Sequence, residues 1–140
     1  MTVFREEVDR ILAPVLTRLG FRAVFDQQGR AFGDELVEFA SDDVRLRIVR
    51  DRGQVFADFG SPADVRRFFD AGVVMEHFDP AASWSLQHDT VAESLRAIGR
   101  FVEAVGAELR STYSPDRYRA SLKRLDAIER GRADRRFGRV

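Results

Sequence analysis

The chain has 140 residues with 23 basic and 23 acidic side chains, so its formal net charge is zero. It contains no cysteine, which excludes disulfides, thiolate nucleophiles and thiolate metal sites. Its length suits one domain with one core. No apolar run approaches the roughly 20 residues that span a bilayer, and the N-terminus is acidic and amphipathic rather than signal-like. We therefore expect a cytoplasmic protein.

The N-terminal residues predict an amphipathic helix from Phe4 to Leu19, because apolar side chains recur at spacings of three and four. Gly20 suits a left-handed cap at the end of this helix. Pro14 lies within the pattern, and an interior proline removes a backbone hydrogen bond at a cost of roughly 3 kcal/mol. We expect a kink at Pro14, and the alternative is a short turn followed by a second helical segment.

Strands are expected next, at residues 21 to 26 and 36 to 41, separated by a turn at 27 to 30 and an irregular stretch at 31 to 33. The strongest strand signal is the hairpin at residues 44 to 60, in which two alternating runs meet at Gly53. If the turn adds no bulge, one face is apolar and holds Val44, Leu46, Ile48, Val55, Ala57 and Phe59. The sequence predicts an α+β fold, an antiparallel three- or four-stranded meander with helices packed on one face.

Several helices are predicted after the hairpin. Ser61 and Pro62 form a helix-start pattern, so a short helix is expected from Pro62 to Asp70. A brief apolar element at residues 73 to 78 and a loop at 81 to 88 follow. A capping box at Thr90 predicts the longest helix of the chain, at 91 to 109, with Gly99 and Gly106 packed closely against the sheet.

A last helix is expected to start at residues 114 to 116, with an apolar stripe of Tyr118, Leu122, Leu125 and Ile128. The segment after residue 130 has too little apolar content to pack. We therefore predict a single domain at residues 1–130 and a mobile basic C-terminal tail at residues 131–140.

The sequence contains no recognisable catalytic motif. The serine elbow of hydrolases, the phosphate-binding glycine loop and the dinucleotide fingerprint are all missing. His77 and His88, the two histidines, match no zinc spacing. A metal-dependent nuclease is the remaining enzymatic alternative, since Glu38 and Asp58 are expected on one sheet face. Ion pairing with neighbouring arginines accounts for the same carboxylates, so we predict a protein that is not an enzyme and has no cofactor or metal site.

The polar face of the hairpin also carries apolar side chains. Strand alternation directs Leu36, Val49 and Phe56 outward among charged residues, and Phe and Arg are enriched at interface cores. Cover by the C-terminal helix, or a register shift at Gly53, would account for the same pattern without an interface. The predicted protein-binding residues are Glu38, Arg45, Arg47, Val49, Phe56 and Asp58. An edge strand with an exposed aromatic residue is also compatible with a homodimer.

The C-terminal segment offers a second hypothesis, because residues 116 to 140 contain nine basic and four acidic residues. Such a segment can bind nucleic-acid phosphates in a salt-dependent way, although a solvated helix face accounts for the same residues. The candidate nucleic-acid-binding residues are Arg117, Lys123, Arg124, Arg132, Arg135 and Arg136. Few aromatic residues lie among them for base stacking, which favours the solvated face.

The sheet pattern from Phe32-Gly33, through Leu36-Val37-Glu38-Phe39, to the run at residues 44–56 resembles small bacterial α+β proteins, some of them similar to immunity proteins that neutralise a toxin. The resemblance covers about 30 residues and carries no motif of a toxin-binding site. It implies a protein that binds another protein through a charged surface complementary to its partner.

Overall fold

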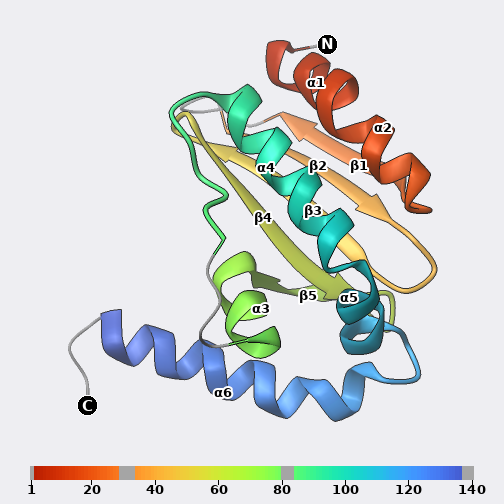
Figure 1. Ribbon diagram of the computed structural model, residues 1–140, viewed down its shortest axis with the longest axis vertical. Helices are drawn as coiled ribbons and strands as arrows, with labels where there is room; N and C mark the ends of the chain where they lie inside the picture. The colour runs from red at the N-terminus through yellow and green to blue at the C-terminus, as the bar shows by residue number, and fades with distance from the viewer. Residues whose placement is uncertain (1, 29–33, 80–83, 137–140) are drawn as a thin grey trace.

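The computed structural model describes residues 2–28, 34–79 and 84–136, apart from the side chains of Gln28 and Arg136. It centres on a five-stranded antiparallel sheet whose strands follow chain order (Figure 1). The strands are β1 (Arg22–Gln28), β2 (Glu35–Ala40), β3 (Arg45–Asp51), β4 (Gln54–Ser61) and β5 (Asp64–Asp70). The predicted α+β class and antiparallel meander are confirmed, but the sheet has five strands where three or four were predicted.

The additional strand is β5, and the helix predicted from Pro62 to Asp70 is wrong. The Ser61 hydroxyl accepts a hydrogen bond from the Ala63 N–H at 3.0 Å, as a helix cap would, but it closes a turn between β4 and β5. Tertiary packing decides the outcome, because Phe69 pairs with Phe59 across the two strands and both side chains are fully buried. A local cap signal does not distinguish a helix start from a turn of this kind.

The hairpin of β3 and β4 has the predicted register. Asp51 lies directly opposite Gln54, with no shift along the pair. The two turn residues, Arg52 and Gly53, both have positive φ, at 54° and 83°, as the tight hairpin turn requires. The apolar face predicted for this hairpin is confirmed, because its six members are buried.

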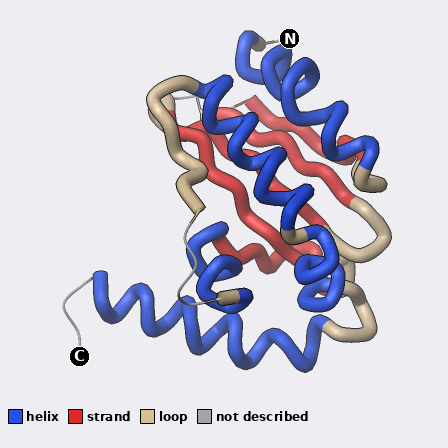
Figure 2. The backbone as a smooth tube through the Cα atoms, in the orientation of Figure 1, coloured by secondary structure: helices blue, strands red, loops and turns tan. Residues whose placement is uncertain are grey.

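Helices cover one face of the sheet, here called the inner face (Figure 1). They are α1 (Val3–Glu7), the π-helix η1 (Val8–Leu12), α2 (Ala13–Arg18), α3 (Ala71–Phe78) and α4 (Val91–Ala104). The core lies between these helices and the sheet, where the Phe59 and Phe101 rings meet edge to face at 5.9 Å. Among the described helices, none crosses the opposite, outer face of the sheet (Figure 2).

Pro14 is accommodated by the π-helix that precedes it. The Ala13 N–H bonds to the Val8 carbonyl, one residue further back than in an α-helix, and Pro14 then lies in the first turn of α2. The chain therefore remains helical through the proline, so the alternative of a turn between two helical segments is wrong, and the irregularity takes the form of a widened π turn. The cap predicted at Gly20 is confirmed, since this residue has φ of 90°.

The C-terminal helices differ from the prediction in length and division. The helix expected at 91 to 109 is divided at Val105 into α4 and α5 (Gly106–Tyr113). The longest helix is α6 (Tyr118–Arg136), which packs against α3 and α5. It continues through Gly131, so residues 131–136 are helical beyond the predicted domain boundary.

Some predicted features lie outside the described residues. They are the irregular stretch at 31–33, the start of the loop at 81–83 and residues 137–140 of the tail. The predicted turn at 27–30 is only partly covered, because β1 continues to Gln28.

Candidate protein-binding face

The outer face brings together all six residues predicted to bind a protein. Strand register places Glu38, Arg47 and Asp58 side by side in one row across β2, β3 and β4. A second row, next to the first, contains Leu36, Val49 and Phe56. Arg45 lies on the same face two residues before Arg47. The face therefore combines a charged row with an apolar row.

Ion pairs and an aromatic ring hold the charged row. The Arg47 guanidinium donates to Asp58 Oδ2 from Nη2 at 3.0 Å and from Nε at 3.3 Å. The same guanidinium lies over the Phe68 ring of β5, 4.4 Å from its centroid. Arg45 forms an ion pair with Glu38, whose residue exposure is only 9%. Each of the two central carboxylates thus has an arginine partner.

The environment of Asp58 is unusual for a surface carboxylate. Burial raises the pKa of its carboxyl above the ordinary value, while the hydrogen bond and positive charge of Arg47 act in the opposite direction. The negative charge of Asp70, directly opposite on β5, raises this pKa further. Asp58 is therefore shielded from water although no described helix covers it.

The apolar row is a property of the sheet itself. The register of the hairpin at Gly53 has no shift, so a slipped hairpin does not account for this row. The C-terminal helix α6 packs on α3 and α5, so within the described chain it does not cover the row either. Leu36, Val49 and Phe56 are half-buried by their neighbours on the sheet.

Two aromatic residues of this face were missed by sequence reasoning. The helix predicted from Pro62 to Asp70 includes Phe68, so the sequence does not predict its contact with Arg47. Phe25 lies opposite Glu38 and is 52% exposed. A strand predicted at residues 64–70 would have placed Phe68 on this face. The adjacent Phe68 and Phe69 fit such a strand, because neighbouring strand side chains point to opposite faces of the sheet.

The six candidate nucleic-acid-binding residues do not form one free basic surface. Arg132 and Arg135 of α6 both contact Glu76 of α3, at 3.5 Å and 3.2 Å. Arg117, Lys123 and Arg124 are exposed, and the side chain of Arg136 is not described. Arg132 and Arg135 therefore form ion pairs within the protein.

The two histidines belong to different segments and have different surroundings. His77 belongs to α3, where burial and then the positive charge of Arg124 lower its pKa. His88 lies before α4, and its Nε2 is 2.9 Å from the Ser85 carbonyl oxygen. Within the described ranges, no three His, Asp or Glu side chains are arranged to hold a metal ion.

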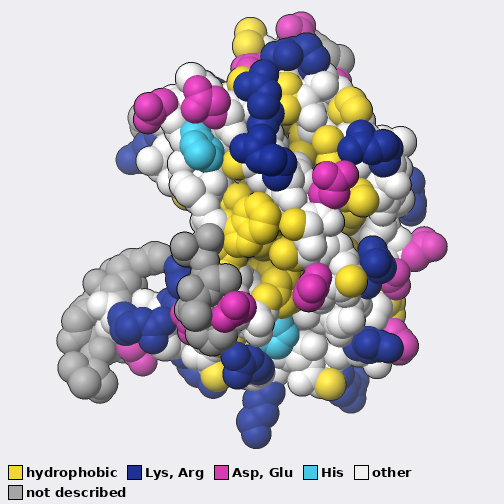
Figure 3. Space-filling view, in the orientation of Figure 1, with side chains coloured by type: hydrophobic (Ala, Val, Ile, Leu, Met, Phe, Trp, Pro, Cys, Tyr) yellow, Lys and Arg dark blue, Asp and Glu magenta, His cyan; other side chains and the backbone are white. Residues whose placement is uncertain are grey.

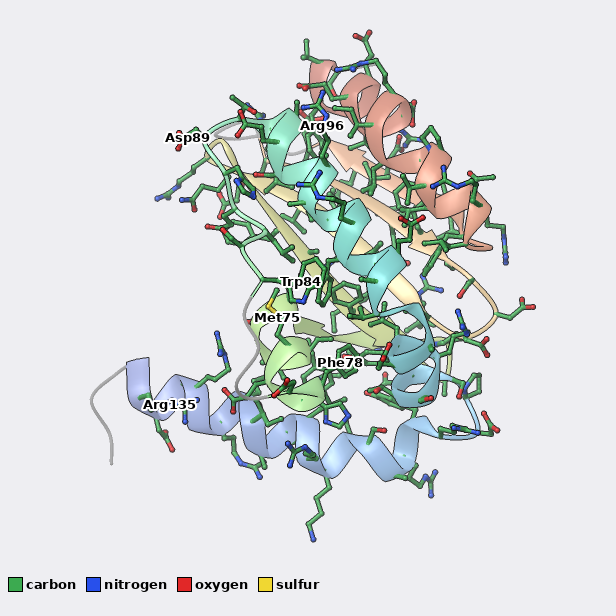
Figure 4. The ribbon with its side chains drawn as sticks, viewed as in Figure 1. Met75, Phe78, Trp84, Asp89, Arg96 and Arg135 are labelled. Carbon is green, nitrogen blue, oxygen red and sulfur yellow. The ribbon has the colours of Figure 1, made fainter. Side chains whose placement is uncertain are left out.

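The helix-covered side carries a separate apolar patch between α3 and α4 (Figure 3). Met75, Phe78 and Trp84 lie there (Figure 4), and the Trp84 ring meets Phe101 edge to face at 5.4 Å.

Across the described segments, no helix has the length and apolar character needed to span a bilayer. Comparison of the chain with protein-family models, curated proteins and solved structures found no match.

Proposed function

We propose that the chain is a non-catalytic protein-interaction module that binds another protein through its outer sheet face. The observation that carries the proposal is the apolar row of Leu36, Val49 and Phe56 beside a charged row, on a face that no described helix covers. Aromatic and arginine side chains are enriched in the cores of protein interfaces, where they supply contact area and directional hydrogen bonds.

The charges on this face indicate the chemistry of the partner. Glu38 and Asp58 are each neutralised by an arginine, so the face does not present a field of one sign. A partner would bury the apolar row under its own apolar side chains and place polar groups opposite the charged row. The resemblance to immunity-type proteins supports a bacterial toxin as the partner and a cytoplasmic inhibitor as the role of this chain.

A pull-down with matched variants tests the proposal. Proteins captured from native lysate are identified by mass spectrometry and purified, and their affinity is measured for wild type, Phe56→Asp and Val65→Asp. Val65 is a suitable control because it is an exposed apolar residue, 52% exposed, on β5. Placing a charge in the centre of an interface weakens binding by several kcal/mol, which is a loss of about a hundredfold or more.

We expect this loss for Phe56→Asp and unchanged affinity for Val65→Asp. Equal affinity of all three proteins would argue against the outer face. The product of a neighbouring gene is the first candidate partner, and co-expression of this chain should relieve its toxicity. Phe56→Asp should abolish that relief.

Nucleic-acid binding through the six basic residues of the C-terminal segment is the alternative, and it has less support because Glu76 already pairs with Arg132 and Arg135. Titration of labelled DNA and RNA at two salt concentrations separates the two proposals. Salt-dependent binding that is lost on removal of residues 131–140 would favour the alternative.

A further inference from the structure

A pocket lies at one end of the sheet and is here called the end pocket. Three segments surround it: the residues that follow α2, the turn between β2 and β3, and the junction of α4 with α5 (Figure 1). It holds about 560 Å³ of space, part of which is open solvent, so a small solute can enter. Its floor is apolar and consists of Leu19, Phe21, Val44, Val102 and Leu109. All of these except Leu19 are buried, so the floor is the edge of the core.

Charged side chains lie at the mouth of the end pocket. Asp43 and Arg110 line both this pocket and an adjoining polar groove. The Arg110 guanidinium lies close to Gly106, where an added Cβ would be 3.4 Å from Nη1. The absence of a side chain at position 106 therefore leaves room for the guanidinium beside the pocket. Small-molecule sites commonly combine an apolar floor with a few polar groups of this kind.

The two charged groups at the mouth are not neutralised within the protein. The side chains of Asp43 and Arg110 form no ion pair or hydrogen bond with each other or with any other part of the described chain. On the outer face, by contrast, Glu38 and Asp58 each have an arginine partner. One acidic and one basic group are therefore available to a ligand that occupies the apolar pocket between them.

We propose that the end pocket binds a free α-amino acid with an apolar side chain. The apolar side chain contacts the floor, the ammonium group donates hydrogen bonds to the Asp43 carboxylate, and the ligand carboxylate accepts them from the Arg110 guanidinium. Hydrogen bonds between oppositely charged groups are stronger than those between neutral groups, so a ligand with both charges is favoured over one with a single charge. The inference does not depend on the proposed function, because the end pocket contains none of the protein-binding residues of the outer face.

Titration of the isotopically labelled full chain, followed by NMR, tests the proposal with three compounds. They are L-leucine, N-acetyl-L-leucine, which resembles the C-terminal residue of a peptide, and L-leucinamide, which resembles the N-terminal residue. We expect L-leucine to shift the backbone amide signals of residues 41–44 and 106–110. It should bind about tenfold or more tightly than either blocked compound, because each of these lacks one charge. No shift with L-leucine, or equal affinity for a blocked compound, would overturn the proposal.

Two variants test the roles of the charged groups, and circular dichroism verifies that both are folded. Arg110→Gln removes the partner of the ligand carboxylate, so this variant should bind L-leucine and L-leucinamide equally. Asp43→Asn removes the partner of the ammonium group and should bind L-leucine and N-acetyl-L-leucine equally. The control is Arg96→Gln, at an exposed arginine of α4 outside the pocket, which should keep the wild-type preferences. Wild-type preferences in Arg110→Gln and Asp43→Asn would refute the site.

Discussion

Arg47 connects three strands of the outer face. Its guanidinium bonds to Asp58 on β4 and lies over Phe68 on β5. Strand alternation predicts the outward direction of Arg47 and the inward direction of its neighbours Leu46 and Ile48, and both are confirmed. The contact with Phe68 was not predictable, because it depends on the pairing of β5 with β4, which lies outside the local sequence.

Replacing Arg47 tests how much this contact contributes to stability. Arg47→Ala leaves the shielded Asp58 carboxylate without its hydrogen-bond donor and removes the cation over Phe68. We expect the free energy of unfolding in urea to fall by about 1–3 kcal/mol. The matched control is Arg66→Ala, at an exposed arginine on β5, where a change within about 0.5 kcal/mol is expected. Equal effects of the two substitutions would show that the Asp58 and Phe68 contacts contribute little.

The pKa of Asp58 predicts a dependence of stability on pH. Its pKa in the folded protein is raised above the ordinary value of 3.8, so ionisation of this carboxyl opposes folding. The destabilisation caused by the ionised Asp58 carboxylate is complete at a pH above its folded-state pKa. It disappears as the pH falls to the ordinary pKa, which applies to the unfolded chain. Relative to Asp58→Asn, the wild-type protein should therefore gain stability as the pH is lowered through this range. Urea unfolding at several pH values measures the difference, and a difference that is constant or grows with pH would contradict the raised pKa.

At the scale of elements, the structure departs from the sequence prediction where long-range packing decides between two local choices. The Ser61-Pro62 pattern suits a helix start, yet β5 forms because Phe69 is buried against Phe59. Val105 divides the long amphipathic pattern into α4 and α5, although the periodicity continues to Leu109. The hairpin of β3 and β4 was predictable because its pattern and its turn residues agree.

Two glycines within regular elements are expected to respond oppositely to substitution by alanine. A Cβ at Gly60 of β4 would lie 2.5 Å from the Arg67 carbonyl oxygen, so Gly60→Ala must displace the β5 backbone. A Cβ at Gly99 of α4 would lie 3.5 Å from Leu12 Cδ1, an ordinary contact. This contact is with η1 and not with the sheet as predicted. We expect Gly60→Ala to destabilise by about 1–3 kcal/mol and Gly99→Ala to stabilise by about 0.5–1 kcal/mol.

Thermal and urea unfolding of the two glycine variants measure these changes. If Gly60→Ala were as stable as the wild type, the close approach of β4 and β5 at this position would be wrong. If Gly99→Ala were strongly destabilising, the packing of α4 on η1 would be tighter than the structure has it.

At the scale of the whole molecule, the arrangement is a sheet with one face covered by helices and one face open (Figure 1). The general class was predictable, because the two-faced hairpin requires cover on one side only. The number of strands and the position of α6 were not, since both depend on contacts between segments far apart in the chain. We propose that the open face binds the partner, while the covered face contributes the core of the protein.

Hydroxyl-radical footprinting of the purified complex between this chain and its captured partner tests directly which face of the sheet binds the partner. Met75 and Trp84 lie on the helix-covered side and serve as internal references (Figure 4). We expect binding to reduce the oxidation of Phe56 and Phe68 and to leave Met75 and Trp84 unchanged. Protection of Met75 and Trp84, with Phe56 and Phe68 oxidised as in the free protein, would contradict recognition through the open face.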